Sequence, residues 1–172
     1  HYQGKICFCA SDGMHGFELW ESDGTAAGTK LVADLNPGTA SSQPGEFQSA
    51  FGDLFFTAHD GKGAAQLFRT DGTPAGTGPL VPVSSSPSGA SASSTVPRSP
   101  SNLTPAAGRL WFVADDAVSG AELWSTDGTP SGTRLVTDLR PGPASSLPDQ
   151  IVERSPTEVA FVAGDGIRGR EL

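Results

Sequence analysis

Four copies of one short pattern recur along the chain, and this repetition limits the fold more than any other feature. In each copy an alanine ends an FxA run, and a leucine follows nine residues later. The alanines are Ala10, Ala58, Ala114 and Ala163, and the leucines are Leu19, Leu67, Leu123 and Leu172. Three copies continue into a DGT triplet, whose Asp stands at 23, 71 and 127, so the spacings are 48 and 56 residues. A period of this length indicates a tandem structural unit.

Each copy has the pattern of several short strands. In the FxA run, Ile6 and Phe8 fall on one face of a strand and Cys7 and Cys9 on the other, so both faces are largely apolar and covered. A weaker strand precedes this run, another follows its turn, and a further one follows the DGT connection. Four short strands in about 50 residues are typical of a propeller blade, whereas a β-sandwich would need alternating apolar and polar positions.

The sequence therefore predicts an all-β fold made of β-propeller blades of four antiparallel strands. About three and a half blades are present, in one repeat domain over residues 1–172. The expected parts are a partial blade (1–38), a second blade with a degenerate motif (46–83), a low-complexity linker (84–102), a third blade (103–142) and a truncated fourth blade (149–172). We expect a fragment of a longer propeller, or a ring completed by another chain. The Ser/Pro-rich linker accounts for the longer spacing, and a mobile loop and a glycosylated segment both stay open for it.

Charge and composition exclude some classes of partner. The net charge is −8 with only 11 Lys and Arg, so a basic surface that tracks phosphates is not expected and nucleic acid is not a predicted partner. The sequence has no run of about 18 apolar residues, and membrane insertion is not expected either. It has no nucleophile elbow, HExxH, P-loop or CxxC pair, so it predicts no catalytic residue.

Two stretches carry a resemblance to a known family. ELWESDGTAAGTKLVADLNPG and ELWSTDGTPSGTRLVTDLRPG, within residues 10–38 and 114–142, resemble the bacterial ELWxxDGT repeat. The copy at 58–83 departs from it, since Gln66 and Phe68 replace Glu and Trp and Pro82 replaces Asp. The resemblance implies tandem arrays in secreted or surface proteins and an extracellular or cell-surface location, but no established activity. The DGT turn is also similar to the Asp-box hairpin of sialidase-type propellers, which is a structural turn.

The DGT residues suit a structural turn. An Asp at a turn accepts hydrogen bonds from following N–H groups, a Gly supplies positive φ, and a Thr hydroxyl bonds the same loop. This role is expected for Asp23, Asp71, Asp127, Thr25, Thr73 and Thr129. The alternative is a weak calcium site at the three aspartates, although one carboxylate per turn is few for this ion. No other cofactor or metal is predicted.

Other recurring residues are predicted to serve packing. Trp20, Phe68 and Trp124 are expected in the core, and Cys7 and Cys9 are expected as two buried thiols. Glu18 and Glu122 stand at a semi-buried position, where a carboxylate anchors loop N–H groups or pairs with Lys or Arg. A general acid or base role across a central tunnel is the alternative for these two.

The turns that follow the FxA runs are predicted to lie on the disc face opposite the DGT turns. Loops held by a rigid scaffold are where function usually resides, so this face is the expected ligand-binding face. Its candidate residues are Asp12, His15, Asp60, Lys62, Asp115, Asp116, Asp165 and Arg168, with Asn36 and Arg140 in the exits of the last strands.

The predicted function is a non-catalytic repeat module of a secreted or cell-surface protein that mediates adhesion or the binding of a protein or glycan. Two alternatives stay open. One is a structural self-assembling unit that completes blades between chains, because unpaired strand edges invite another chain. The other is a propeller hydrolase or lyase, which rests on fold analogy alone. Expected partners are a protein or glycan at a surface, a homo-oligomer, or further repeats of the same chain.

Overall fold

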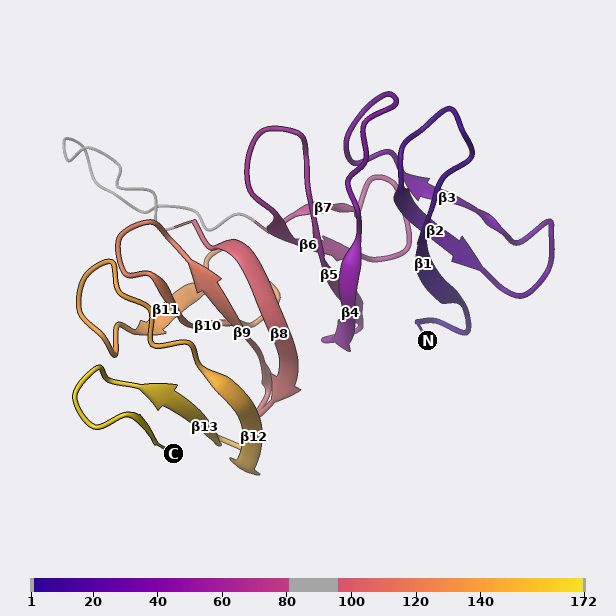
Figure 1. Cartoon of the computed structure of the whole chain (residues 1–172). Helices are drawn as coiled ribbons and strands as arrows, with labels where there is room; N and C mark the ends of the chain where they lie inside the picture. The colour runs from indigo at the N-terminus through magenta and orange to yellow at the C-terminus, as the bar shows by residue number, and fades with distance from the viewer. Residues whose placement is uncertain (1, 81–95, 172) are drawn as a thin grey trace. The chain divides into compact units, whose positions relative to one another are not determined.

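A computed structural model describes residues 2–80 and 96–171, and all regular structure in these two ranges is β (Figure 1). Sheet 1 holds β1 (Ile6–Ala10), β2 (Glu18–Ser22) and β3 (Lys30–Ala33). Sheet 2 holds β4 (Gly45–Ala50), β5 (Asp53–Ala58), β6 (Gln66–Thr70) and β7 (Gly78–Pro79). Sheet 3 holds β8 (Arg98–Ala106), β9 (Arg109–Asp115), β10 (Ala121–Thr126) and β11 (Arg134–Thr137), and sheet 4 holds β12 (Asp149–Ser155), β13 (Glu158–Gly164) and β14 (Arg170–Glu171).

Within each sheet every strand pairs antiparallel with the next strand in sequence. This confirms the all-β prediction and the order of strands in each copy. Closure of these sheets into a propeller stays a prediction.

The chain divides into two compact units. One is His1–Pro79, with sheets 1 and 2, and the other is Leu80–Leu172, with sheets 3 and 4. Each unit is described by itself below, and the expected single repeat domain over residues 1–172 stays a prediction. Among the described residues, no helix exists that could cross a membrane.

Sheet 3 begins earlier than the sequence predicted. Strand β8 starts at Arg98, whereas the sequence predicts a linker up to residue 102 and a third blade from residue 103. The Ser/Pro-rich composition of residues 84–102 favours a linker, and Pro100 cannot donate a hydrogen bond to a ladder. Since β8 is the edge strand of its sheet, the missing N–H group is tolerated. Residues 81–95, which include most of the predicted linker and the end of the predicted second blade, lie outside the described residues.

The first strands of sheets 2, 3 and 4 share a β-bulge that is not evident from the sequence. Glu46, Asn102 and Gln150 have left-handed φ values of 50°, 56° and 52°, each within a register shift against the next strand. The residue after each bulge is apolar and faces inward, and these residues are Phe47, Leu103 and Ile151. The bulge therefore re-aims one side chain into the core of each sheet.

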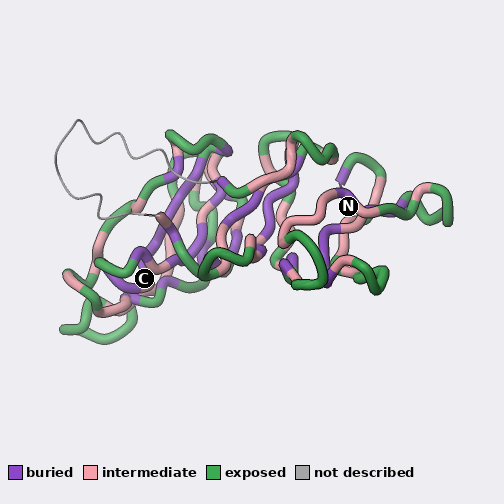
Figure 2. The backbone as a smooth tube through the Cα atoms, turned by 90° about the horizontal axis from the view of Figure 1, so that it is seen from above, coloured by how far each residue is buried: buried purple, intermediate pink, exposed green. Residues whose placement is uncertain are grey.

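Sheets 1 and 2 pack face to face through one apolar cluster. Leu19 and Val32 from sheet 1 meet Phe56, Ala58 and Phe68 from sheet 2, and Cys7, Leu35 and Phe47 pack against them. We call the face with the FxA phenylalanine the front face of a sheet, and the opposite face, which carries Leu19 and Cys7 in sheet 1, the back face. In this unit the back face of sheet 1 packs on the front face of sheet 2. Burial follows the strands, and the connecting turns are mostly exposed (Figure 2).

Coverage of both strand faces holds in β5 but not in β1. Phe55 and Phe56, on opposite faces of β5, are both fully buried, whereas Ile6 of β1 is 46% exposed. The prediction of two buried thiols is wrong for Cys9, which is exposed, while Cys7 is partly buried against the cluster. Cys9 stands one position before the end of β1, next to an exposed turn that leaves its side chain uncovered.

Candidate binding site

The three DGT turns are closed hydrogen-bond networks. Asp23 Oδ1 accepts from the Thr25 N–H at 2.9 Å and from Thr25 Oγ1 at 2.7 Å, and Thr25 Oγ1 accepts from the Gly28 N–H at 2.9 Å. The same bonds recur with Asp71, Thr73 and Gly76, and with Asp127, Thr129 and Gly132. These contacts are those of a structural turn. The Thr hydroxyl, followed by the Thr N–H, lowers the pKa of each of the three carboxyl groups.

The second glycine of the DGTxxGT motif is explained by close contact with this aspartate. A Cβ on Gly28 would lie 2.0 Å from Asp23 Oδ1, and Cβ atoms on Gly76 and Gly132 would meet Asp71 and Asp127 as closely. The final threonine closes the loop, since Thr29 Oγ1 donates to the Thr25 carbonyl at 2.7 Å. Within the described residues no group of three or more His, Cys, Asp or Glu is arranged to hold a metal ion, and calcium at these turns stays a prediction.

Glu18 and Glu122 anchor the loops that leave β3 and β11. Glu18 is fully buried, and its two oxygens accept from the Leu35 and Ser42 N–H groups, both at 2.8 Å. Glu122 is equally buried and accepts from the N–H groups of Leu139 at 3.3 Å and Ser146 at 2.8 Å. Each also accepts from the hydroxyl of the same serine. These contacts match the predicted anchoring of loop N–H groups, and they leave neither carboxylate exposed.

The turns after the FxA runs are also organised by an aspartate. Asp12 Oδ1 accepts from the N–H groups of Met14 at 2.9 Å and His15 at 2.8 Å. Asp60, Asp116 and Asp165 accept in the same way, from Lys62, from Val118 and Ser119, and from Ile167 and Arg168. These bonds use one carboxylate oxygen. The Asp60 carboxyl group also has a side-chain hydrogen bond with Gln66, whereas Asp116 Oδ2 is buried without a hydrogen-bond partner in the described structure. In the first turn, Asp12 Oδ2 lies 2.8 Å from His15 Nδ1.

The exit loop of one sheet reaches the aspartate turn of the next sheet in both units. In the first unit a Cβ on Gly61 would lie 2.4 Å from Asn36 Oδ1, and in the second a Cβ on Gly166 would lie 2.8 Å from Arg140 Nε. The structure thus brings Asn36 to the turn of Asp60 and Lys62, and Arg140 to the turn of Asp165 and Arg168. We call this junction the seam. The predicted residues Asp12, His15, Asp115 and Asp116 are not part of either seam contact.

A cavity of about 380 Å³ lies at the seam of the first unit. Asp34, Asp60 and Lys62 line it together with apolar residues that include Leu35 and Pro79. Asp34 Oδ2 accepts from the Gly38 N–H at 3.3 Å, whereas Asp34 Oδ1 is buried and has no hydrogen-bond partner in the described structure. Lys62 Nζ lies 3.8 Å from Asp60 Oδ2 on a side chain that is 85% exposed. The Lys62 backbone N–H is the main cause of a lowered pKa at Asp60.

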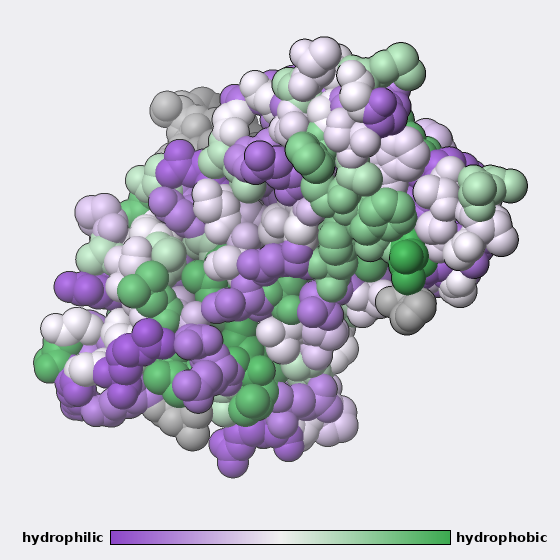
Figure 3. Space-filling view, turned by 45° about the vertical axis from the view of Figure 1, so that its right-hand side comes forward, coloured by the Kyte–Doolittle hydropathy of each residue, from purple (hydrophilic) through white to green (hydrophobic). Residues whose placement is uncertain are grey.

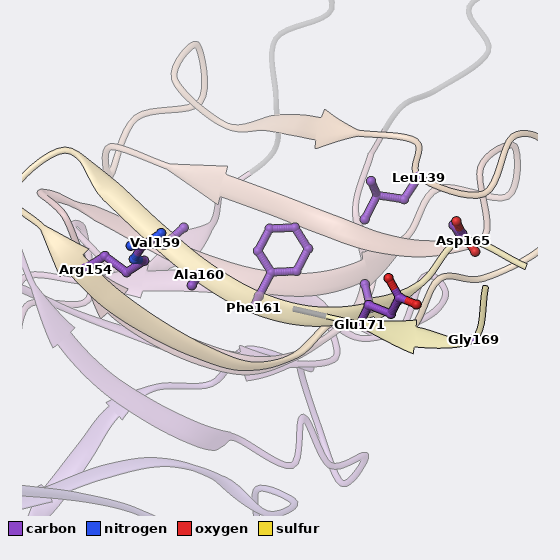
Figure 4. Close-up of a pocket in the computed structure, with 9 residues that line it drawn as sticks. Leu139, Arg154, Val159, Ala160, Phe161, Asp165, Gly169 and Glu171 are labelled. Atoms are coloured by element: carbon purple, nitrogen blue, oxygen red, sulfur yellow. The ribbon is translucent and has the colours of Figure 1, made fainter. Parts of the chain in front are cut away.

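A second cavity, of about 410 Å³, lies beside β13 (Figure 4). The Phe161 ring stands in it, with Leu139, Asp165 and Glu171 around it. In sheets 2 and 3 the corresponding rings are stacked, Phe56 on Phe68 with centroids 5.6 Å apart and Phe112 on Trp124 at 6.4 Å. Phe161 has no such ring partner among the described residues, so this cavity occupies a packing position of the sheet. The Asp34 cavity is the better candidate for a ligand.

Sequence reasoning named Asp60 and Lys62 but missed Asp34. Its signal was present, because Asp34 and Asp138 recur at the same place in the two best copies, and Asp138 Oδ1 is also buried without a partner in the described structure. The sequence does not reveal that one carboxylate oxygen stays unpaired. Such a group is costly to bury, which marks it as a place where a ligand donor is favoured.

Comparison of the chain with known protein families, curated proteins and solved structures identified no related protein. The class that the described structure defines is an all-β protein of four antiparallel sheets, with a polar seam where one sheet follows another.

Proposed function

We propose that the chain is a non-catalytic binding module of a secreted or cell-surface protein, and that a glycan residue binds in the cavity of Asp34, Asp60 and Lys62. The observation that carries the proposal is that Asp34, which lines a cavity of about 380 Å³, has a buried acceptor, Oδ1, without a hydrogen-bond partner in the described structure. This size falls within the range of about 300–1,000 Å³ that is common for small-ligand pockets.

The lining suits a ligand rich in hydroxyl groups. Asp34 Oδ1 and the Asp60 carboxylate accept hydrogen bonds from hydroxyls, and the Lys62 ammonium donates to a hydroxyl or ring oxygen. Leu35 and Pro79 offer apolar surface to the C–H faces of a sugar ring. A carboxylate bond to a neutral donor contributes more than a neutral pair, about 1.5–3 kcal/mol, so Asp34 carries much of the expected specificity.

The proposed architecture is a set of propeller blades. The antiparallel meander of each sheet and the packing of the back face of sheet 1 on the front face of sheet 2 support it. In such an arrangement the seam recurs wherever one blade follows another, so a module of this kind offers several similar binding places. Repetition of weak sites raises the avidity for a glycan-coated surface.

A glycan array probed with and without a chelator, followed by calorimetric titration of a soluble ligand, tests the proposal. Asp34→Asn is the informative variant, because the amide can keep the Gly38 contact while its NH₂ group replaces the unpaired acceptor by a donor. We expect this change and Lys62→Ala to weaken binding at least about tenfold. The matched control is Lys30→Ala, which removes a lysine outside the cavity.

Three results would contradict the proposal: no glycan bound under either condition, binding of a protein partner alone, or equal losses in the variants and the control. Loss of binding with the chelator would instead assign calcium a bridging role between the carboxylates and the sugar hydroxyls.

A further inference from the structure

One triplet of the sequence has the pattern of an acceptor for a covalently attached sugar. Asn102, Leu103 and Thr104 fit N-x-S/T with a residue other than proline in the middle, which is the acceptor pattern of N-linked glycans in secreted proteins. The other asparagine of the sequence, Asn36, is followed by a proline, and its amide already donates to the Ser41 carbonyl at 3.1 Å. Hydrophilic and hydrophobic side chains intermix over the surface (Figure 3), so the pattern, and not hydropathy, marks this triplet.

The structure presents Asn102 outward from sheet 3. Its φ of 56° places it in the left-handed region at the β-bulge of β8, a conformation that Asn adopts more readily than most residues. Asn102 is exposed, whereas the next residue, Leu103, is only 5% exposed and fixes the strand to the core. Among the described strands β8 pairs with β9 alone, so no strand is paired with its other edge (Figure 1). The bulge therefore leaves room for a bulky group at Asn102 within its own unit.

Both groups that the acceptor pattern requires are accessible. The side-chain amide of Asn102 makes no hydrogen bond in the described structure. Thr104 is partly exposed, and its hydroxyl donates to the Asn102 carbonyl at 3.1 Å, which keeps it beside the acceptor residue. Glu46 and Gln150 occupy the same place in the bulges of sheets 2 and 4 without a hydroxyl residue two positions later. The bulge itself therefore requires neither the unpaired amide nor the threonine.

We propose that Asn102 is the acceptor of an N-linked glycan. In the reaction, Nδ2 of Asn102 attacks the anomeric carbon of a sugar that is activated as a glycosyl diphosphate. The bond between the nitrogen and this carbon forms, the bond from the carbon to the diphosphate oxygen breaks, and the amide releases one proton while the diphosphate leaves with the electron pair. The inference rests on the proposed secreted or cell-surface location, and it is independent of the Asp34 cavity. A glycan at this place would also hinder pairing of another chain with the open edge of β8.

The test begins with the protein recovered from the cells that make it and from their medium. Electron-transfer fragmentation of its peptides locates a covalent sugar on a particular residue and gives the mass of that sugar. We expect a sugar on Asn102 in the protein that is outside the cell or on its surface. Sugars added singly would identify a nucleotide-linked donor, whereas one oligosaccharide of fixed mass would identify a lipid-linked donor.

Four variants made in the same cells separate the acceptor pattern from the fold. Asn102→Asp keeps a residue that tolerates a left-handed φ, and it should lose the sugar. Thr104→Val removes the hydroxyl and should lose the sugar too, although Asn102 is unchanged. The matched controls are Thr104→Ser, which keeps the pattern, and Ser101→Ala, which removes a hydroxyl outside it, and both should retain the sugar. Circular dichroism and the urea midpoint check the fold of each variant.

The inference is wrong if Asn102 is unmodified in protein from outside the cell, if Thr104→Val keeps the sugar, or if Ser101→Ala loses it. An unmodified Asn102 leaves the proposed glycan binding intact, because calorimetric titration of the same protein tests the Asp34 cavity separately. Protein found only inside the cell, with Asn102 unmodified, would contradict both this inference and the proposed location.

Discussion

Two kinds of aspartate turn alternate along the chain, and they differ in what surrounds the aspartate. In the DGT turn, Asp23 Oδ1 takes both the N–H and the hydroxyl of Thr25, and Gly28 lies directly against the carboxylate. In the turn after the FxA run, Asp12 Oδ1 takes two backbone N–H groups and Oδ2 bonds the side chain of His15. The DGT turn makes its hydrogen bonds within seven residues. In the turn after the FxA run, the backbone N–H groups occupy only one carboxylate oxygen, and the other can bond a side chain such as that of His15.

The second glycine of each turn shows the consequence. A Cβ on Gly28 would meet the aspartate of its own turn, but a Cβ on Gly16 would lie 2.1 Å from the carbonyl oxygen of Ala40 in the exit loop. Glu18 holds that exit loop in place, because its carboxylate accepts hydrogen bonds from the N–H groups of Leu35 and Ser42. The DGT turn therefore stabilises one hairpin, while the other turn docks against a long-range loop and can form a site.

The largest expected effect comes from filling these glycine positions. Gly16→Ala should destabilise the protein by about 3 kcal/mol, because a backbone carbonyl must move. Gly28→Ala should cost about 1–2 kcal/mol, since Asp23 can rotate away and lose only its turn hydrogen bonds. Unfolding in urea measures both free energies.

Gly63→Ala is the control for this pair. It lies in a turn of the second kind, but a Cβ there would meet nothing within 4 Å, so we expect less than about 0.5 kcal/mol. If Gly28→Ala proved more costly than Gly16→Ala, the proposed contrast between a local and a docked turn would be wrong.

A smaller loss of stability is expected from substitution of Glu18, whose carboxylate holds the exit loop after β3. Glu18→Gln leaves one oxygen for two backbone N–H groups and points its amide donors at the other, so about 2 kcal/mol of stability should be lost. Amide hydrogen exchange should show faster exchange at Leu35 and Ser42 and no change at Thr25. Equal acceleration at all three amides would mean that the substitution weakens the whole unit instead of the exit loop.

The sequence could predict the elements that depend on local rules. The DGT geometry follows from Asp, Gly and Thr at adjacent positions, and apolar runs with a fixed offset to the next turn reveal the strands. The start of strand β8 could not be predicted, because residues 98–102 continue a Ser/Pro-rich stretch and their pairing depends on β9. The Asp34 cavity could not be predicted, since it depends on how the exit loop of one sheet meets the turn of the next.

The smallest effect concerns the ion pair between Asp12 and His15, in the turn after the first FxA run. Here the second carboxylate oxygen of Asp12 already has His15 as its partner. The hydrogen bond to Asp12 raises the pKa of His15, and bonds from His15 and Met14 hold the pKa of Asp12 below its usual range. A raised histidine pKa means that the pair contributes stability below the unfolded value of about 6.5 and loses it as the pH rises through the folded pKa. The lowered pKa of Asp12 sets a limit at acid pH. The stability that the pair contributes is lost as the pH falls through the pKa of Asp12 in the folded protein.

Asp12→Asn isolates this pair, because the amide oxygen can still accept the two backbone N–H groups that close the turn. An NMR titration of the His15 ring should show a lower pKa in the variant than in the unmodified chain. The urea midpoint should change little at a pH above both measured His15 pKa values, where the imidazole is neutral in both proteins. An unchanged His15 pKa would show that Oδ2 of this aspartate is not committed to the ring. In that case Asp12 Oδ2 would be open to a ligand.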